Sequence, residues 1–134
     1  MKHKLLIDER KIIVFATIEG NNEIRRFRFI LDTGASRTII DENTALILGY
    51  DIKKLDKGDR LMAASGAIQS KNLNLPKFSL FGKDIANFEV SVINFPRQIT
   101  YYADGVLGMD FLLQFKKLTF DFDKQTVETL ENSD

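Results

Sequence analysis

The stretch FRFILDTGAS, residues 27–36, passes directly from an apolar strand pattern into Asp32, Thr33 and Gly34. Alternate residues of its first half are apolar, as in a strand with one buried face. A carboxylate at the end of such a strand, followed at once by a flexible glycine, is either a turn-forming residue or part of a catalytic site. The rest of the chain is needed to choose between these two interpretations.

Length and composition predict one soluble globular domain over residues 1–134. Apolar residues make up 44% of the chain, and Lys plus Arg equal Asp plus Glu at 19 each. This balance gives no electrostatic reason to expect nucleic acid or a membrane as a partner. The basic run Arg25, Arg26 and Arg28 is interpreted as one solvated face of a strand plus its neighbours. The start, MKHKLLIDERK, resembles neither a signal peptide nor a membrane span, so we expect a cytoplasmic location.

The chain contains no cysteine, and its one histidine, His3, lies near a terminus that we expect to be mobile. The absence of cysteine excludes thiolate chemistry. A single histidine near a terminus makes a histidine-based triad or a histidine-rich metal site very unfavourable as an interpretation. We expect no metal and no cofactor. Carboxylates, hydroxyls, Lys, Arg or Tyr must carry any chemistry.

The residue pattern predicts mainly short strands. Residues 11–19 and 23–31 form a hairpin through the turn GNNE, and 38–40 are extended. Asp41 is the expected N-cap of a helix that ends at Gly49. Short extended pieces follow over 60–92, separated by turns at Ser65-Gly66, Pro76 and Phe81-Gly82. Many short strands with frequent turns favour a closed or sandwiched β architecture.

The last third of the chain is predicted to contain a loop, a short helix and a strand. The loop includes Pro96 and residues 101–104, the amphipathic helix lies within MDFLLQF, and an alternating strand begins near Leu118. Four phenylalanines are assigned to the core: Phe78, Phe81, Phe88 and Phe111. The alternative for some phenylalanines is the lining of an apolar substrate cleft.

Two motifs together resemble the retropepsin-type, single-domain aspartic proteases: ILDTGAS at 30–36 and DGVLGMDFL at 104–112. The resemblance spans roughly residues 11–122. It implies an all-β acid-protease fold, a closed β-barrel with one or two short helices and a β-hairpin flap. It further implies an aspartic endopeptidase, a hydrolase that cleaves peptide or protein substrates. The site residues that it implies are the catalytic Asp32; the active-site loop Thr33, Gly34 and Ala35; the flap tip Ala64, Ser65 and Gly66; and the supporting motif Gly105, Val106, Leu107 and Gly108.

The sequence holds one Asp-Thr-Gly and therefore one catalytic acid per chain. Peptide hydrolysis by carboxylates needs an ionised group that takes a proton from water and a protonated group that donates one. Two carboxyl groups a few ångströms apart share one proton and can fill both roles. The resemblance therefore implies a homodimer in which Asp32 of each copy meets its counterpart on a two-fold axis.

The pattern departs from the viral enzymes at two positions. Ser36 and Met109 stand where those enzymes place an acidic residue and an arginine that form an ion pair. The chain therefore looks more like cellular or bacterial members of the family, and a viral-style dimer of interleaved termini is not carried over. Asp104 is interpreted as a turn residue and Asp110 as an acid in the first turn of a helix.

Two other interpretations stay open. In the first, the acid-protease fold is a catalytically silent module for peptide binding or dimerisation, because an intact motif does not prove a productive geometry. In the second, the chain is a β domain without a cleft function, which predicts a monomer.

Overall fold

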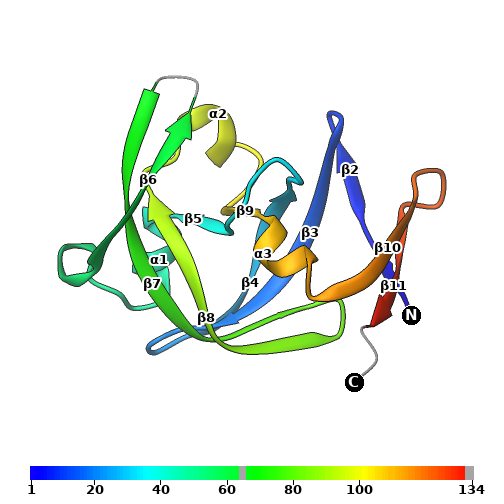
Figure 1. Ribbon diagram of the computed structural model, residues 1–134, viewed down its shortest axis with the longest axis horizontal. Coiled ribbons are helices and arrows are strands. Elements are labelled where there is room, and N and C mark those ends of the chain that lie inside the picture. The colour runs from blue at the N-terminus through cyan, green and yellow to red at the C-terminus, as the bar shows by residue number, and fades with distance from the viewer. Residues whose placement is uncertain (64–65, 132–134) are drawn as a thin grey trace.

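The structure of the protein is a computed structural model that describes residues 1–63 and 66–131 (Figure 1). The helices are short: α1 (Glu42–Ile47), the 3₁₀ helix η1 (Ile52–Lys54), α2 (Arg97–Thr100) and α3 (Met109–Leu112). The strands are β1 (Lys2–Lys4), β2 (Leu6–Asp8), β3 (Lys11–Glu19), β4 (Ile24–Leu31), β5 (Ile39–Asp41), β6 (Asp56–Ala63), β7 (Gly66–Leu80), β8 (Lys83–Ile93), β9 (Gly105–Leu107), β10 (Phe115–Asp121) and β11 (Thr126–Glu131).

Most strands belong to one strongly curved sheet, in the order β2-β3-β4-β9-β5-β8-β7-β6. An additional antiparallel pairing joins β3 to β7, for example Thr17 to Ser79. This pairing closes the strands β3, β4, β9, β5, β8 and β7 into a ring. A smaller sheet has the order β1-β11-β10. The predicted all-β fold is confirmed.

The hairpin β3–β4 follows the predicted alternation. Val14, Ala16 and Ile18 of β3 are buried, as are Phe27 and Phe29 of β4, whereas the residues between them face outwards. The turn is closed by a hydrogen bond from Gly20 N to Glu23 O (2.7 Å). Because the side-chain period of a strand is two, this alternation fixes the register in which the end of β4 leads into Asp32.

Phenylalanines fill the centre of the ring. The ring centroid of Phe78 lies 4.9 Å from that of Phe88, 5.4 Å from that of Phe111 and 5.6 Å from that of Phe29. Edge and tilted contacts of this kind are favourable beyond simple burial. Phe81 is also buried, so all four phenylalanines assigned to the core are confirmed there.

The predicted turn at Pro76 is wrong. Strand β7 runs unbroken through this residue, with Leu75 paired to Phe88 and Lys77 paired to Ala86 on either side of it. Proline cannot donate to the ladder, but the pairs before and after it hold the register. The turn at Phe81-Gly82 is confirmed, since it joins β7 to β8 and both residues have positive φ.

Helix α2 is absent from the predicted elements. It spans four residues, which is too short for an apolar period to appear in the sequence. The carbonyl of Pro96 accepts hydrogen bonds from Ile99 N (3.0 Å) and Thr100 N (3.2 Å), which starts the turn. The predicted helix in MDFLLQF also proves shorter, because β10 begins at Phe115.

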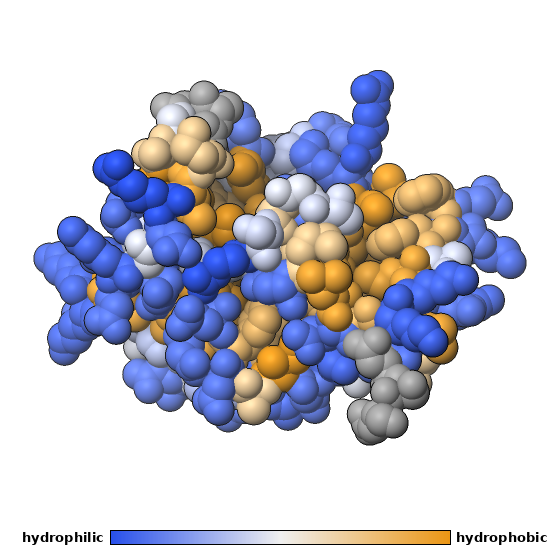
Figure 2. Space-filling view, viewed as in Figure 1, coloured by the Kyte–Doolittle hydropathy of each residue, from blue (hydrophilic) through white to orange (hydrophobic). Residues whose placement is uncertain are grey.

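The expectation of a mobile N-terminus is wrong. Strand β1 pairs antiparallel with β11, with His3 opposite Val127, so the first and last strands lie side by side (Figure 1). Leu5 and Val127 belong to the buried core. Figure 2 shows apolar surface on the side of the β10–β11 hairpin, where Phe122 and Leu130 are exposed.

Within the described ranges, no helix has the length and apolar character needed to span a membrane.

Candidate active site

Asp32 lies at the point where two parallel strands end together. Strand β4 pairs with β9, with Leu31 opposite Leu107, and Asp32 N donates to Leu107 O (3.0 Å). The strand pairing thereby carries the aspartate to the edge of the sheet and fixes its backbone. Asp32, Thr33 and Gly34 are exposed at this edge.

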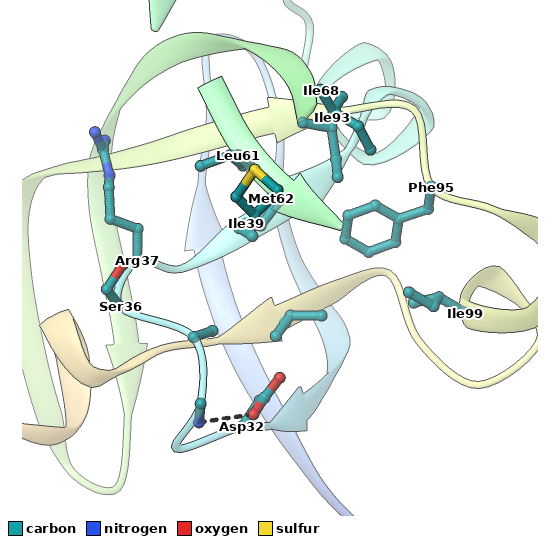
Figure 3. Close-up of a pocket in the computed structure, with 13 residues that line it drawn as sticks. Asp32, Ser36, Arg37, Ile39, Leu61, Met62, Ile68, Ile93, Phe95 and Ile99 are labelled. Carbon is teal, nitrogen blue, oxygen red and sulfur yellow. Dashed lines mark hydrogen bonds between the residues drawn. The ribbon is translucent and has the colours of Figure 1, made fainter. Parts of the chain in front are cut away.

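The loop that follows orients the carboxylate. Gly34 N donates to Asp32 Oδ1 (2.8 Å), the contact drawn in Figure 3, and Ala35 N donates to Asp32 O (3.1 Å). A Cβ on residue 34 would lie 3.1 Å from Asp32 Oδ1, which is closer than ordinary packing allows. Glycine at this position therefore lets the backbone amide approach the carboxylate.

The motif Gly105, Val106, Leu107 and Gly108 supports this loop from behind. A Cβ on Gly108 would lie 2.5 Å from the backbone carbon of Arg37 and 2.9 Å from Ala35 O. Met109 N donates to Ala35 O (2.8 Å). The backbone of the active-site loop thus rests directly on the start of α3, and a side chain at residue 108 would separate them.

A buried threonine joins the same two segments. Thr38 donates through its N to Asp110 Oδ2 (2.9 Å) and through its Oγ1 to Asp110 Oδ1 (2.7 Å), while Gly108 N donates to Thr38 Oγ1 (3.1 Å). Asp110 does lie in the first turn of α3, as predicted, and also accepts from Phe111 N (2.8 Å). The role of Thr38 was missed, because a single threonine before an apolar pair carries no signal in the sequence.

Asp104 anchors the loop before β9. Its Oδ2 accepts from Arg28 N (2.9 Å) and its N donates to Arg28 O (2.7 Å). Thr44 Oγ1 donates to Asp104 O (2.9 Å). These contacts are those of a structural loop residue, and Asp104 does not line the cleft described next.

A cleft of about 430 Å³ opens above Asp32. In Figure 3 the carboxylate lies on its floor and apolar side chains form the opposite wall. The lining residues come from residues 32–37, from β5, β6, β7, β8 and β9, and from the segment before and within α2: Asp32, Gly34, Ala35, Ser36, Arg37, Ile39, Leu61, Met62, Ile68, Ile93, Phe95, Ile99 and Val106. Such a wall suits an extended chain with apolar side chains.

The hairpin β6–β7 supplies one wall of the cleft and occupies the predicted position of the flap. Ala63 pairs with Gly66, which has φ +117°, a conformation that favours glycine. Of the predicted tip residues, Ala64 and Ser65 lie outside the described part of the chain. Met62 of this hairpin is 83% exposed, so its side chain is open to a ligand in the cleft.

Arg37 lies at one end of the cleft. Its guanidinium contacts Glu89 of β8 (3.1 Å) and Asp59 of β6 (4.0 Å). It therefore links the active-site loop to the hairpin, although exposed ion pairs of this kind contribute little to stability.

The opposite end of the cleft is held by Asp41. Its Oδ1 accepts from Phe95 N (2.9 Å) and its Oδ2 from Asn43 N (3.3 Å), so it caps α1 as predicted and also fixes Phe95. This second role was missed, because Asp41 and Phe95 are 54 positions apart and the sequence carries no sign of a contact at that distance.

The structure brings Asp32, Gly34, Ala35 and Val106 to one cleft, whereas Thr33, Gly105, Leu107 and Gly108 do not line it. Among the residues that the structure describes, no three His, Asp or Glu side chains are grouped as metal ligands would be.

The sequence and the fold were compared with known protein families and structures. A family model described as aspartyl protease matches residues 14–111. A search of curated proteins found no match. Among solved structures, a retropepsin-like aspartic protease from Rickettsia conorii gives a TM-score of 0.73 at 22% identity, covering 96% of this chain and 89% of that chain.

Two further solved structures share the fold. The EIAV protease, complexed with the inhibitor HBY-793, gives a TM-score of 0.62 at 18% identity, covering 78% of this chain and 88% of that chain. The retroviral protease-like domain of Ddi1 from Leishmania major gives 0.58 at 18% identity, covering 92% and 94%. The retropepsin-like fold is therefore shared across bacterial, viral and eukaryotic proteins.

Proposed function

Because this chain belongs to the aspartyl protease family, we propose that it is an aspartic endopeptidase whose catalytic residue is Asp32. The observation that carries the proposal is the position of Asp32 on the floor of an apolar cleft, with one carboxylate oxygen held by Gly34 N. A fixed, solvent-accessible carboxylate beside a peptide-sized groove is what activation of a water molecule requires.

The active unit of the proposal is a homodimer. Each chain supplies one Asp-Thr-Gly, and the exposed Asp32, Thr33 and Gly34 form the surface that a second copy would cover. On a two-fold axis the same loop of each chain meets its counterpart, so two Asp32 carboxyl groups face each other. The site of a single chain is incomplete without this partner.

In the proposed reaction, a water molecule held between the two carboxyl groups attacks the carbonyl carbon of the scissile peptide bond. The ionised Asp32 takes a proton from the water, and the protonated Asp32 donates one to the carbonyl oxygen. Transfer of a proton to the amide nitrogen then releases the amine product. No covalent intermediate with the protein forms.

The cleft indicates an extended peptide or protein substrate. The apolar wall of Ile39, Ile93, Phe95 and Ile99 would accept apolar side chains on either side of the scissile bond. The β6–β7 hairpin would cover the bound chain and exclude water.

The proposal is tested by cleavage of a diverse peptide pool between acidic and neutral pH, with wild type beside Asp32→Asn. We expect cuts by wild type and none by the variant, at matched folding and oligomeric state. Equal cleavage by both proteins would disprove the role of Asp32. Peptide that is recovered bound but whole, from a confirmed wild-type dimer, would instead indicate a catalytically silent binding module.

A mixing experiment tests the dimer separately. If both carboxyl groups are needed, random exchange with an equal amount of Asp32→Asn leaves about a quarter of the dimers with two intact Asp32 residues. Activity per wild-type chain should then fall by about half. Activity that stays constant in a large excess of the variant would show that one chain works alone.

A further inference from the structure

A second groove, also of about 430 Å³, lies apart from the active-site cleft and shares no lining residue with it. It runs between the chain segment that links β1 to β2, the outer face of β3 and β4, and the turn between β7 and β8. Its lining residues are His3, Lys4, Leu5, Leu6, Phe15, Arg26, Leu80 and Phe81. We call the groove that these residues line the β1 groove.

The floor of the β1 groove is apolar. Leu6 of β2 and Phe15 of β3 are 37% and 39% exposed, and Phe15 stands out because Val14, Ala16 and Ile18 of the same strand are buried. Leu5, Leu80 and Phe81 continue the floor and are nearly buried. Apolar surface in a concave site is the usual mark of a binding surface.

The rim of the β1 groove is cationic. No carboxylate occurs among its described lining residues, and Arg26 holds its guanidinium 4.7 Å from the centroid of the Phe15 ring. Burial, followed by the nearby N-terminal ammonium, lowers the pKa of His3. The imidazole is therefore neutral at neutral pH, and Lys4 and Arg26 carry the charge.

Arg26 differs from its neighbours in β4. Arg25 pairs with Glu23 (3.7 Å) and Arg28 pairs with Asp8 (2.7 Å). Over the described ranges 1–63 and 66–131, Arg26 and Lys4 form no ion pair. Of the three arginines in this basic run, Arg25 and Arg28 are each paired with a carboxylate. Arg26 is not, and it lies above the exposed ring of Phe15.

The backbone beside the groove is open to pairing. Strand β1 pairs with β11, and in its sheet it is an edge strand. Met1 N donates to Thr129 O (3.1 Å) and Thr129 N donates to Met1 O (2.9 Å). In an antiparallel ladder, pairs that exchange two hydrogen bonds alternate with pairs that exchange none. Since Met1 and Thr129 exchange two, the N–H and C=O groups of Lys2 and Lys4 point away from β11, to the free edge.

We propose that the β1 groove binds an extended polypeptide segment that alternates apolar and acidic residues. The segment adds to the free edge of β1, its apolar side chains enter the groove over Leu6 and Phe15, and its carboxylates face Lys4 and Arg26. Strand addition supplies affinity through the backbone, and alternate side chains supply selectivity. This binding site is independent of proteolysis at Asp32.

The test measures fluorescence anisotropy of a labelled peptide of alternating leucine and glutamate, with the full chain carrying Asp32→Asn so that nothing is cut. We expect saturable binding, and we expect Arg26→Glu to raise the dissociation constant about tenfold or more. The variant replaces attraction between residue 26 and the carboxylates of the peptide with repulsion. Arg25→Glu is the matched control, because it makes the same change in net charge at a neighbouring residue outside the groove. It should alter the dissociation constant by no more than about twofold.

Four results would overturn the proposal. The first is equal weakening by Arg25→Glu and Arg26→Glu, which would indicate a general charge effect. The second is loss of binding with Met62→Glu but not with Arg26→Glu, which would place the peptide in the active-site cleft. The third is tighter binding of oleate than of the leucine–glutamate peptide, and the fourth is equal binding of a leucine–lysine peptide. Unfolding temperatures of all variants, measured alongside, show whether each is folded.

Discussion

Thr38 and Asp110, separated by 72 residues in the sequence, are joined by two hydrogen bonds of 2.9 and 2.7 Å. Thr38 lies three residues after Ala35, the last residue of the active-site loop, and Asp110 lies in the first turn of α3. The pair therefore locks the loop that carries Asp32 to the helix behind it. A site that depends on the exact placement of a carboxylate needs such support.

Removal of the Thr38 hydroxyl should destabilise the protein. Thr38→Val keeps the side-chain shape but leaves Gly108 N without its acceptor in a buried site, which costs about 1–3 kcal/mol of unfolding free energy. Urea denaturation measures this change. Thr38→Ser, which keeps the hydroxyl, is the control and should lose clearly less. Equal stability of the Val and Ser variants would contradict a structural role for the hydroxyl.

Two glycine substitutions should separate stability from activity. Gly108→Ala drives a Cβ against the backbone of Arg37 (2.5 Å), so we expect a loss of about 1–3 kcal/mol together with reduced cleavage. Gly34→Ala meets only Asp32 Oδ1 (3.1 Å), so stability should change little while cleavage falls. Denaturation and peptide cleavage assays, run on both variants, check this. Unchanged cleavage by Gly34→Ala would show that the fit around Asp32 is not critical.

The pairing of β1 with β11 can be tested by proline. His3→Pro removes an amide that lies in a hydrogen-bonded pair with Val127, whereas Lys2→Pro removes one that faces the free edge. We expect His3→Pro to lower the unfolding free energy by about 1–2 kcal/mol and Lys2→Pro to cost less. His3→Ala controls for loss of the imidazole. If both proline variants behave alike, the assigned register of β1 is wrong.

Tyr102 should titrate at unusually high pH. Its hydroxyl donates to the carboxylate of Glu9, and this bond, with lesser contributions from burial and nearby negative charge, raises the pKa of Tyr102 to about 12. The folded state favours the neutral phenol, so this contribution to stability is present below pH of about 10 and is lost as pH rises through about 12.

The measurement is the ultraviolet absorbance of tyrosinate as pH is raised. Glu9→Gln should move the titration of Tyr102 back towards the ordinary value, and Tyr102→Phe identifies its step among the three tyrosines. A titration curve that Glu9→Gln leaves unchanged would mean that Glu9 does not control the phenol.

Activity per chain should fall on dilution if the dimer is the active species. A single chain carries one Asp32, and mass action removes the dimer as concentration drops below its dissociation constant. Cleavage rates over a dilution series, compared with sedimentation at the same concentrations, test this expectation. A constant rate per chain while the sedimenting species changes from dimer to monomer would contradict it.

Several features of the fold could be predicted because they depend on neighbours in the chain. The hairpin of residues 11–31 follows from alternating apolar residues around a glycine turn, and Asp41 caps α1 because a cap acts on amides two residues away. The turn at Pro76 was wrong because sheet pairing on both sides of the proline outweighed its local preference. Helix α2 was missed because four residues carry too little pattern.

The sequence by itself determined the nature of this protein: an all-β chain with one Asp-Thr-Gly at the end of an apolar strand and a second apolar motif closed by glycine. These signals are local. The alternation of side chains along a strand, and the need for glycine where a Cβ would clash, both depend on the backbone conformation of a few neighbouring residues. Only the tertiary structure decided that Thr38 meets Asp110, that Asp41 holds Phe95 and that β1 pairs with β11. These contacts join residues far apart in the chain. Contacts between residues so far apart form only when the whole chain has folded. They produce no periodic residue pattern that could be recognised in the sequence.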